Sequence, residues 1–206
     1  MAQLLIHLVN AGGLLAILVL MTAESAGLPI SSEIVVPLGG ALASGAIAGS
    51  AHLSFWGVVA AATVGNLVGS LVAYALTRRY GAQVILGPGR HVGLDHGHLA
   101  LAERFFDRFG LAAVFFGRLL PVVRTYISFP AGLSRRITPG RFTVFTLAGA
   151  LPWNLGLAFA GLKLGDNWSN VEKALGPLTI PAAIVVVAVV VVVYFAGKRV
   201  LEREAG

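Results

Sequence analysis

The 206-residue chain contains no cysteine and few charged side chains. The absence of cysteine excludes disulfides, thiol nucleophiles and thiolate metal sites. Asp, Glu, Lys and Arg together make up 12% of the residues, about half the share found in soluble domains, whereas 57% are hydrophobic. This composition excludes an ordinary soluble domain.

Long runs without a charged residue separate the few charges. Four runs reach the roughly 20 residues that a helix needs to cross a bilayer core of about 30 Å. They are Met1–Ala23, Ile34–Thr77, Phe142–Leu162 and Ala174–Gly197. We therefore predict an all-α polytopic membrane protein whose residues 1–206 form a single membrane domain. Residues 1–23 lack the basic start of a secretory signal, so we expect a retained helix.

The basic residues are distributed unevenly, and none precedes Arg78. Three clusters follow: Arg78, Arg79, Arg90, Arg104 and Arg108; Arg135, Arg136 and Arg141; and Lys198, Arg199 and Arg203. The positive-inside rule places all three in the cytoplasm, and we expect both termini there too. The net charge of +6 then reports membrane topology, and no nucleic-acid partner is expected.

Two arginines interrupt an otherwise uncharged stretch, residues 109–134. Arg118 and Arg124 each cost roughly 2.5–3.5 kcal/mol at bilayer depth, which implies a role. A guanidinium is well shaped for phosphate or carboxylate. Because the stretch begins and ends beside cytoplasmic clusters, we expect a re-entrant hairpin. The residues expected to break its helix are Pro121, Pro130 and Gly132.

The first half of the chain has a similar segment. Residues 34–77 are too long for one helix, so we expect a second hairpin over residues 24–49 and a span over residues 53–77. Pro29 and Gly40 are expected to break this hairpin, which would open toward the outside. The other expected parts are spans at 1–23, 141–164 and 174–197 and an interfacial segment at 78–108.

Glycine and proline spacings repeat between the halves. Pro29 and Gly40 have the same separation as Pro121 and Gly132, and Gly65–Gly81 matches Gly149–Gly165. Four spans and two opposed hairpins in an inverted repeat are typical of transporters with a midplane site. The alternative is a helix bundle with irregular loops.

The first hairpin carries two acids, Glu24 and Glu33, and the second carries the two arginines. If the hairpin tips meet, these charges neutralise in pairs. One interpretation is that they only lock the hairpins together. The other is a site in which Arg118 and Arg124 bind a phosphate, while the glutamates compete for them and take up protons.

Other polar residues are weaker candidates. Asn66, Asn154 and Thr125 could face a cavity, although the asparagines also suit interhelical hydrogen bonds. Residues 91–98 contain three histidines without a fixed ligand spacing, which favours a solvated segment over a metal site. We expect no metal and no cofactor, with a proton gradient as the driving force. Residues 99–109 are expected to form an amphipathic interfacial helix.

Two motifs resemble those of the DedA family, also called the SNARE-associated or VTT-domain family. Residues 28–33, L-P-I-S-S-E, follow Glu24 and resemble its acidic motif. Residues 117–125, G-R-L-L-P-V-V-R-T, resemble its arginine motif, with P-A-G following at 130–132. R-F at 141–142 and G-A-L-P-W-N at 149–154 also match. The resemblance covers about residues 24–168, and departures are Ser31 for proline and Leu119 for phenylalanine.

The resemblance implies two opposed re-entrant hairpins and lipid transport. Bacterial members recycle undecaprenyl phosphate from the outer to the inner leaflet, and eukaryotic relatives scramble phospholipids. The family's acidic pair corresponds to Glu24 and Glu33, and its arginine pair to Arg118 and Arg124. We therefore expect a non-enzymatic, proton-coupled flippase for a phosphate-bearing lipid in the bacterial inner membrane; a homo-oligomer is compatible with the sequence. The alternatives are a proton-coupled transporter of a small ion or soluble anion, and a membrane phosphatase.

Overall fold

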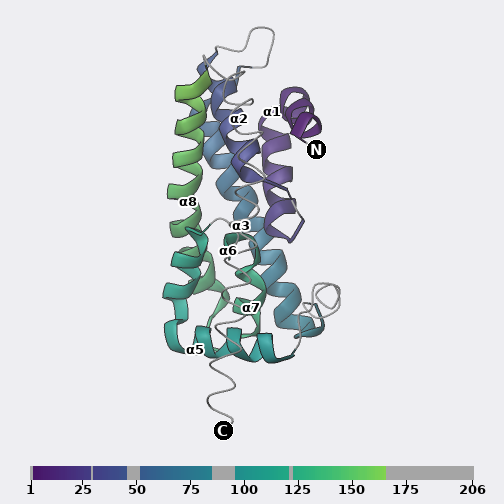
Figure 1. Ribbon diagram of the computed structural model, residues 1–206, viewed down its shortest axis with the longest axis vertical. Coiled ribbons are helices and arrows are strands. Elements are labelled where there is room, and N and C mark those ends of the chain that lie inside the picture. Colours follow the sequence, from purple (N-terminus) through teal and green to yellow (C-terminus); the bar gives the residue numbers. More distant parts are fainter. Residues whose placement is uncertain (1, 29, 46–51, 85–95, 121–122, 166–206) are drawn as a thin grey trace. The chain divides into compact units, whose positions relative to one another are not determined.

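The computed structural model describes residues 2–28, 30–45, 52–84, 96–120 and 123–165. These residues form helices, with no strand among them (Figure 1). The helices are α1 (Ala2–Ser25), α2 (Ser32–Ser44), α3 (Phe55–Tyr80), α5 (His96–Arg118), α6 (Val123–Tyr126), α7 (Ser128–Leu133) and α8 (Pro139–Leu164). Three stretches are long and apolar enough to cross a membrane: His7–Ser25, Phe55–Tyr80 and Pro139–Leu164. The predicted class, an all-α multi-pass membrane protein, is confirmed for this part of the chain; the expected helix at 174–197 lies outside it.

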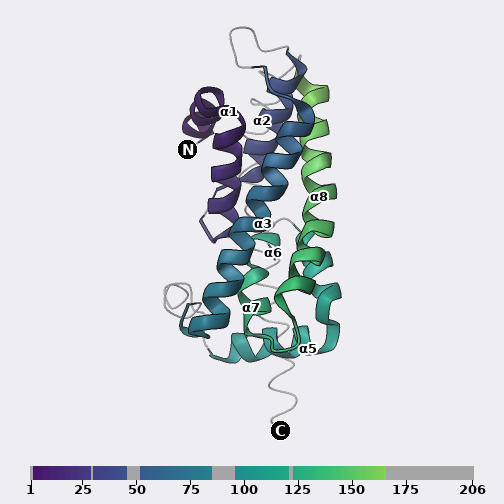
Figure 2. The ribbon, with the colours of Figure 1, turned by 180° about the vertical axis from the view of Figure 1, so that it is seen from behind.

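The two long helices α3 and α8 run antiparallel. Near the start of α3, Thr63 accepts a hydrogen bond from Asn154, and near its end Tyr74 stacks on Phe142 with ring centroids 4.6 Å apart. Each helix has 26 residues, or about 39 Å at 1.5 Å per residue, which exceeds the bilayer core. Figures 1 and 2 show the two helices along the length of the bundle.

Helix α1 bends at Gly13, and only its second part runs along α3. Gly13 has φ 56° and ψ −134°, a conformation that favours glycine. A Cβ on Gly57 would meet Leu14, and a Cβ on Gly69 would meet Ser25. Later residues of α3 therefore lie beside later residues of α1, which means that the two helices are parallel. A cytoplasmic amino terminus and a cytoplasmic Arg78 require residues 1–23 and 53–77 to run in opposite directions, and for the part of α1 after Gly13 this expectation is wrong.

The first hairpin consists of α1 and α2. Helix α1 continues through Glu24, so the end of α1 is itself the first limb, and Ser32–Ser44 is the second. Gly40 does not break this hairpin as expected: it lies inside α2, where an added Cβ would collide with the backbone of Ala158 on α8. Pro29 lies outside the described residues.

The second half repeats this plan in the opposite direction. Helix α5 bends at Gly110, with φ 54° and ψ −129°, so that the predicted amphipathic segment lies across one end of the bundle and the remainder forms a limb (Figure 1). The return limb is α6 and α7, which are separated at Ile127. Pro130 lies in the first turn of α7, and α6 ends at Tyr126, the residue whose carbonyl the missing N–H of Pro130 would have bonded, so the helix is broken beside this proline as expected. Pro121 lies outside the described residues.

Equivalent glycines make equivalent contacts in the two halves. Gly65 lets α1 approach α3, and Gly149 lets α5 approach α8. Gly40 brings α2 against α8, and Gly132, which lies inside α7 and does not break its hairpin, brings α7 against the Tyr74 carbonyl of α3. Each hairpin therefore packs one limb on its own long helix and the other limb on the long helix of the other half.

Candidate anion-binding site

The tips of the two hairpins meet at an ion pair. One terminal nitrogen of Arg124 donates to both carboxylate oxygens of Glu24, at 2.8 and 2.9 Å, and to Ser32 Oγ at 2.5 Å. The side chains of Arg124 and Glu24 are 4% and 3% exposed. Hydrogen bonding between partners that are 100 residues apart fixes the tip of one half against the tip of the other.

The ion pair lies level with the middle of the two long helices. A Cβ on Gly69, just past the midpoint of α3, would meet Ser25, the neighbour of Glu24. The Arg124 guanidinium lies over the ring of Trp153, which is just past the midpoint of α8, 5.4 Å from the ring centroid. A cation at this distance gains a favourable interaction with the indole face.

Arg118 is buried but has a different set of partners. Its guanidinium donates to the Arg124 carbonyl at 3.2 Å and to Ser128 Oγ at 2.7 Å, and it lies 6.0 Å from the centroid of the Phe142 ring. Glu33 is half-buried and accepts a hydrogen bond from Ser31 at 2.9 Å. The expected pairing of all four charges is therefore only half met: in the described part of the chain, Arg124 with Glu24 is the ion pair of this site.

Unlike Arg124, Arg118 is buried without a carboxylate as a hydrogen-bond partner among the described residues. Arg118 is 3% exposed and its hydrogen-bond acceptors, a carbonyl and a hydroxyl, are neutral. An isolated buried charge is costly unless an opposite charge or strong hydrogen bonds compensate it. The arrangement is therefore suited to an added anion beside Arg118.

Three hydrogen-bond donors on Arg118 and on α8 have no partner among the described residues. They are Arg118 Nε, Thr146 Oγ1 and Trp153 Nε1, all of them buried atoms. Thr146, Gly149 and Trp153 share one face of α8 because they are three and four residues apart, and Gly149 packs on the Arg118 stem. Unpartnered buried donors call for a ligand or a water, and donors suit an anion.

The remaining polar candidates lie on α3, α6 and α8. Asn154 donates to Thr63 at 3.2 Å, which joins α8 to α3. Asn66 is buried, and its side-chain oxygen has no partner in the described part of the chain. Thr125 is half-buried on α6. The histidine segment at 91–95 lies outside the described residues.

Sequence analysis missed the small polar partners of the arginines. Ser32 and Ser128 are both fully buried and bind Arg124 and Arg118, respectively. Thr146 and Trp153 were likewise not identified as site residues. The available signal was their position: Ser32 is next to Glu33, Ser128 lies one helical turn after Arg124, and Thr146 and Trp153 are two turns apart on one face of α8.

Comparison with known proteins identifies the family of this chain. The profile of the VTT domain matches residues 29–163, which include both arginines, all of α3, and α8 up to its penultimate residue. This chain belongs to the VTT-domain family. This is the DedA family whose motifs are described above, so the resemblance drawn from the sequence is confirmed. No solved structure matches the chain.

Several curated bacterial proteins are similar over most of their length. Undecaprenyl phosphate transporter A of Bacillus subtilis (strain 168) is 32% identical over 170 residues, 82% of each chain. The Staphylococcus aureus (strain NCTC 8325 / PS 47) protein of the same name is 29% identical over 208 residues, covering 99% of this chain and 98% of the relative. An alkaline phosphatase-like protein of Lactococcus lactis subsp. lactis (strain IL1403) is 28% identical over 211 residues, covering 99% and 96%.

Proposed function

We propose that this VTT-domain protein moves undecaprenyl phosphate, or a similar polyprenyl phosphate or phospholipid, between the leaflets of the bacterial cytoplasmic membrane. The observation that carries the proposal is the buried arginine pair at the middle of α3 and α8, where Arg124 is bonded to Glu24 and Arg118, among the described residues, is bonded to neutral groups. The names of two relatives, both undecaprenyl phosphate transporters, support a phosphate-bearing lipid as the substrate.

The head-group phosphate would bind on the side of Arg118. Arg118 Nε, Thr146 Oγ1 and Trp153 Nε1 supply unused donors there, whereas Arg124 is already occupied by Glu24. Arginine recognises phosphate through charge-assisted, often bidentate hydrogen bonds. An arriving phosphate would also compete with Glu24 for Arg124, and displacement of the carboxylate would favour its protonation. Glu24 is therefore our first candidate for proton coupling and Glu33 the second.

The distribution of charge supports an orientation in the membrane. Arg78 at the end of α3 donates to the Ser134 carbonyl at 2.8 Å, so the exposed residues Arg78, Arg79, Arg135 and Arg136 lie at one end of the bundle. The positive-inside rule makes this end cytoplasmic. Because α1 is parallel to α3, the amino-terminal part of α1 would be external, not cytoplasmic as first expected. Both hairpins would then be re-entrant, and α3, α8 and the predicted helix at 174–197 would span the bilayer.

Leaflet exposure of undecaprenyl phosphate tests this proposal. Depletion of the protein should raise the amount of this lipid accessible on the outer surface of cells, and wild-type protein should restore it. Restoration should fail with Arg118→Gln, which removes the uncompensated charge. Unaltered exposure on depletion would instead favour transport of a small ion or soluble anion. Release of inorganic phosphate from the lipid by purified protein would favour a phosphatase, the activity in the name of the Lactococcus lactis relative.

A further inference from the structure

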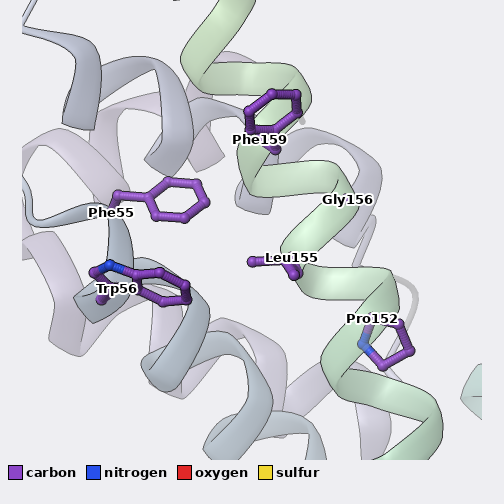
Figure 3. Close-up of a pocket in the computed structure, with 6 residues that line it drawn as sticks. All are labelled: Phe55, Trp56, Pro152, Leu155, Gly156 and Phe159. Atoms are coloured by element: carbon purple, nitrogen blue, oxygen red, sulfur yellow. The ribbon is translucent and has the colours of Figure 1, made fainter.

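An apolar groove lies between the start of α3 and the second half of α8. Its volume is about 460 Å³, within the ~300–1,000 Å³ typical of ligand pockets. Figure 3 shows Phe55 and Trp56 on one side and the residues of α8 on the other. The lining consists of Phe55, Trp56, Pro152, Leu155, Gly156 and Phe159.

The chemistry of the groove suits hydrocarbon. None of the six lining residues carries a charge, and the exposed fractions of Trp56 and Phe159 are 69% and 51%. Both lie on helices long and apolar enough to span a bilayer, so their exposed faces are expected to contact lipid chains. The indole N–H of Trp56 is the single hydrogen-bond donor among these six side chains, so the lining offers little to a soluble anion.

The inner end of the groove and the candidate anion site use neighbouring residues of α8. Pro152 lines the groove, and the next residue, Trp153, lies with its ring beneath Arg124. The other end reaches Phe55 and Trp56, the first residues of α3, at the end of the bundle away from the basic clusters. The groove therefore leads from the middle of α8 toward the end proposed to be external.

We propose that this groove holds the hydrocarbon chain of the phosphate lipid while its head group occupies the arginine site. The proposal rests on the function proposed above and specifies how one molecule uses both surfaces. The phosphate would lie at mid-bundle beside Arg118, and the chain would pass Trp153 and remain among the lipids of the external leaflet. The lipid would thus cross head first, and its chain would never enter the polar interior.

Gly156 allows a direct test of occupancy. An added Cβ at Gly156 would meet nothing within 4 Å, and the same is true of Gly140 at the start of α8. The chain has no cysteine, so Gly156→Cys and the control Gly140→Cys can each carry a single benzophenone label. The labelled proteins are reconstituted in phosphatidylcholine vesicles that contain a few per cent of undecaprenyl phosphate, illuminated and examined by mass spectrometry.

The label at residue 156 should capture undecaprenyl phosphate well above its share of the vesicle lipid, and the label at residue 140 should not. Adding Arg118→Gln should abolish this enrichment, because the chain would lose its anchored head group. Capture in simple proportion to lipid composition would overturn the proposal. So would a crosslink to residues 166–206 of the same chain, since that segment would then be the occupant.

A steric variant separates failure of this inference from failure of the proposed function. Gly156→Leu should fill the groove and slow flipping of undecaprenyl phosphate severalfold, whereas Gly140→Leu should not. If the wild-type protein and the Gly156→Leu variant flip the lipid at the same rate, the role of the groove is refuted and the proposed transport is not. Absence of flipping by wild-type protein, together with enriched capture at residue 156, would refute transport but retain the lipid site.

Discussion

Arg124 holds both carboxylate oxygens of Glu24 with a single terminal nitrogen, at 2.8 and 2.9 Å. The pair joins the tips of two hairpins that belong to opposite halves of the chain. Its position beside the middle of α3 and α8 gives the protein a buried charged site where a membrane protein ordinarily tolerates none. The consequences of this arrangement can be tested separately for stability, binding, packing and orientation.

Loss of Glu24 should destabilise the protein far more than loss of Glu33. Removing one partner of a buried ion pair costs about 3–5 kcal/mol, because the remaining charge is left uncompensated. Glu24→Ala should therefore lower the free energy of unfolding in detergent by this amount. Glu33→Ala, which loses a bond to Ser31 at a half-buried position, should cost about 1 kcal/mol. Equal losses would contradict the assigned pairing.

The two arginines should respond differently to lysine. Arg118→Lys should weaken binding of undecaprenyl phosphate by at least about tenfold, or ~1.4 kcal/mol, because the free Nε and the planar fork are lost. Arg124→Lys should weaken it less and should mainly destabilise the fold through Glu24 and Ser32. Binding can be measured by native mass spectrometry of the detergent-solubilised protein. Unchanged binding in Arg118→Lys would refute the position proposed for the phosphate.

Equivalent glycines of the two halves should be equally intolerant of a methyl group. Added Cβ atoms would collide with the Ala158 backbone at Gly40 and approach the Tyr74 carbonyl to 2.5 Å at Gly132. Overpacking of this kind costs about 1–3 kcal/mol, so Gly40→Ala and Gly132→Ala should each lower the unfolding midpoint. Gly140→Ala, which meets open space, should change stability by less than about 0.5 kcal/mol.

Single cysteines should report the orientation of α1. His7, His52 and Arg135 are all exposed, and the natural chain has no cysteine. His7→Cys and His52→Cys should react with an impermeant maleimide in intact spheroplasts, since both would lie at the external end. Arg135→Cys should react only after permeabilisation. If His52→Cys is labelled and His7→Cys is protected, the amino terminus lies on the cytoplasmic side and the proposed orientation of α1 is wrong.

Much of the candidate site could be predicted because charge inside a membrane segment is conspicuous. Arg118 and Arg124 stand alone in an apolar stretch between basic clusters, which predicts both a hairpin and an anion. The choice of acid could not be predicted, because Glu24 and Glu33 flank the same turn. The structure separates them locally: Glu24 ends α1 against α3, whereas Glu33 starts α2 and is held by Ser31.

The direction of α1 could not be predicted for a physical reason. No Lys or Arg precedes Arg78, so the positive-inside rule had no charge to count in this part of the chain. The bend at Gly13 depends on one backbone conformation, which composition does not reveal. Ser32, Ser128 and Thr146 were missed because serine and threonine in apolar helices commonly bond to their own backbone, as Ser70 does here.

Flipping of undecaprenyl phosphate in proteoliposomes tests the central claim most directly. Purified wild-type protein, Arg118→Gln and the packing control Gly140→Ala would be reconstituted with a fluorescent analogue of the lipid in one leaflet. We predict that wild-type protein and Gly140→Ala transfer the analogue to the other leaflet and that Arg118→Gln does not. Transfer by Arg118→Gln at the wild-type rate would contradict the claim that the buried arginine site carries the phosphate across the membrane.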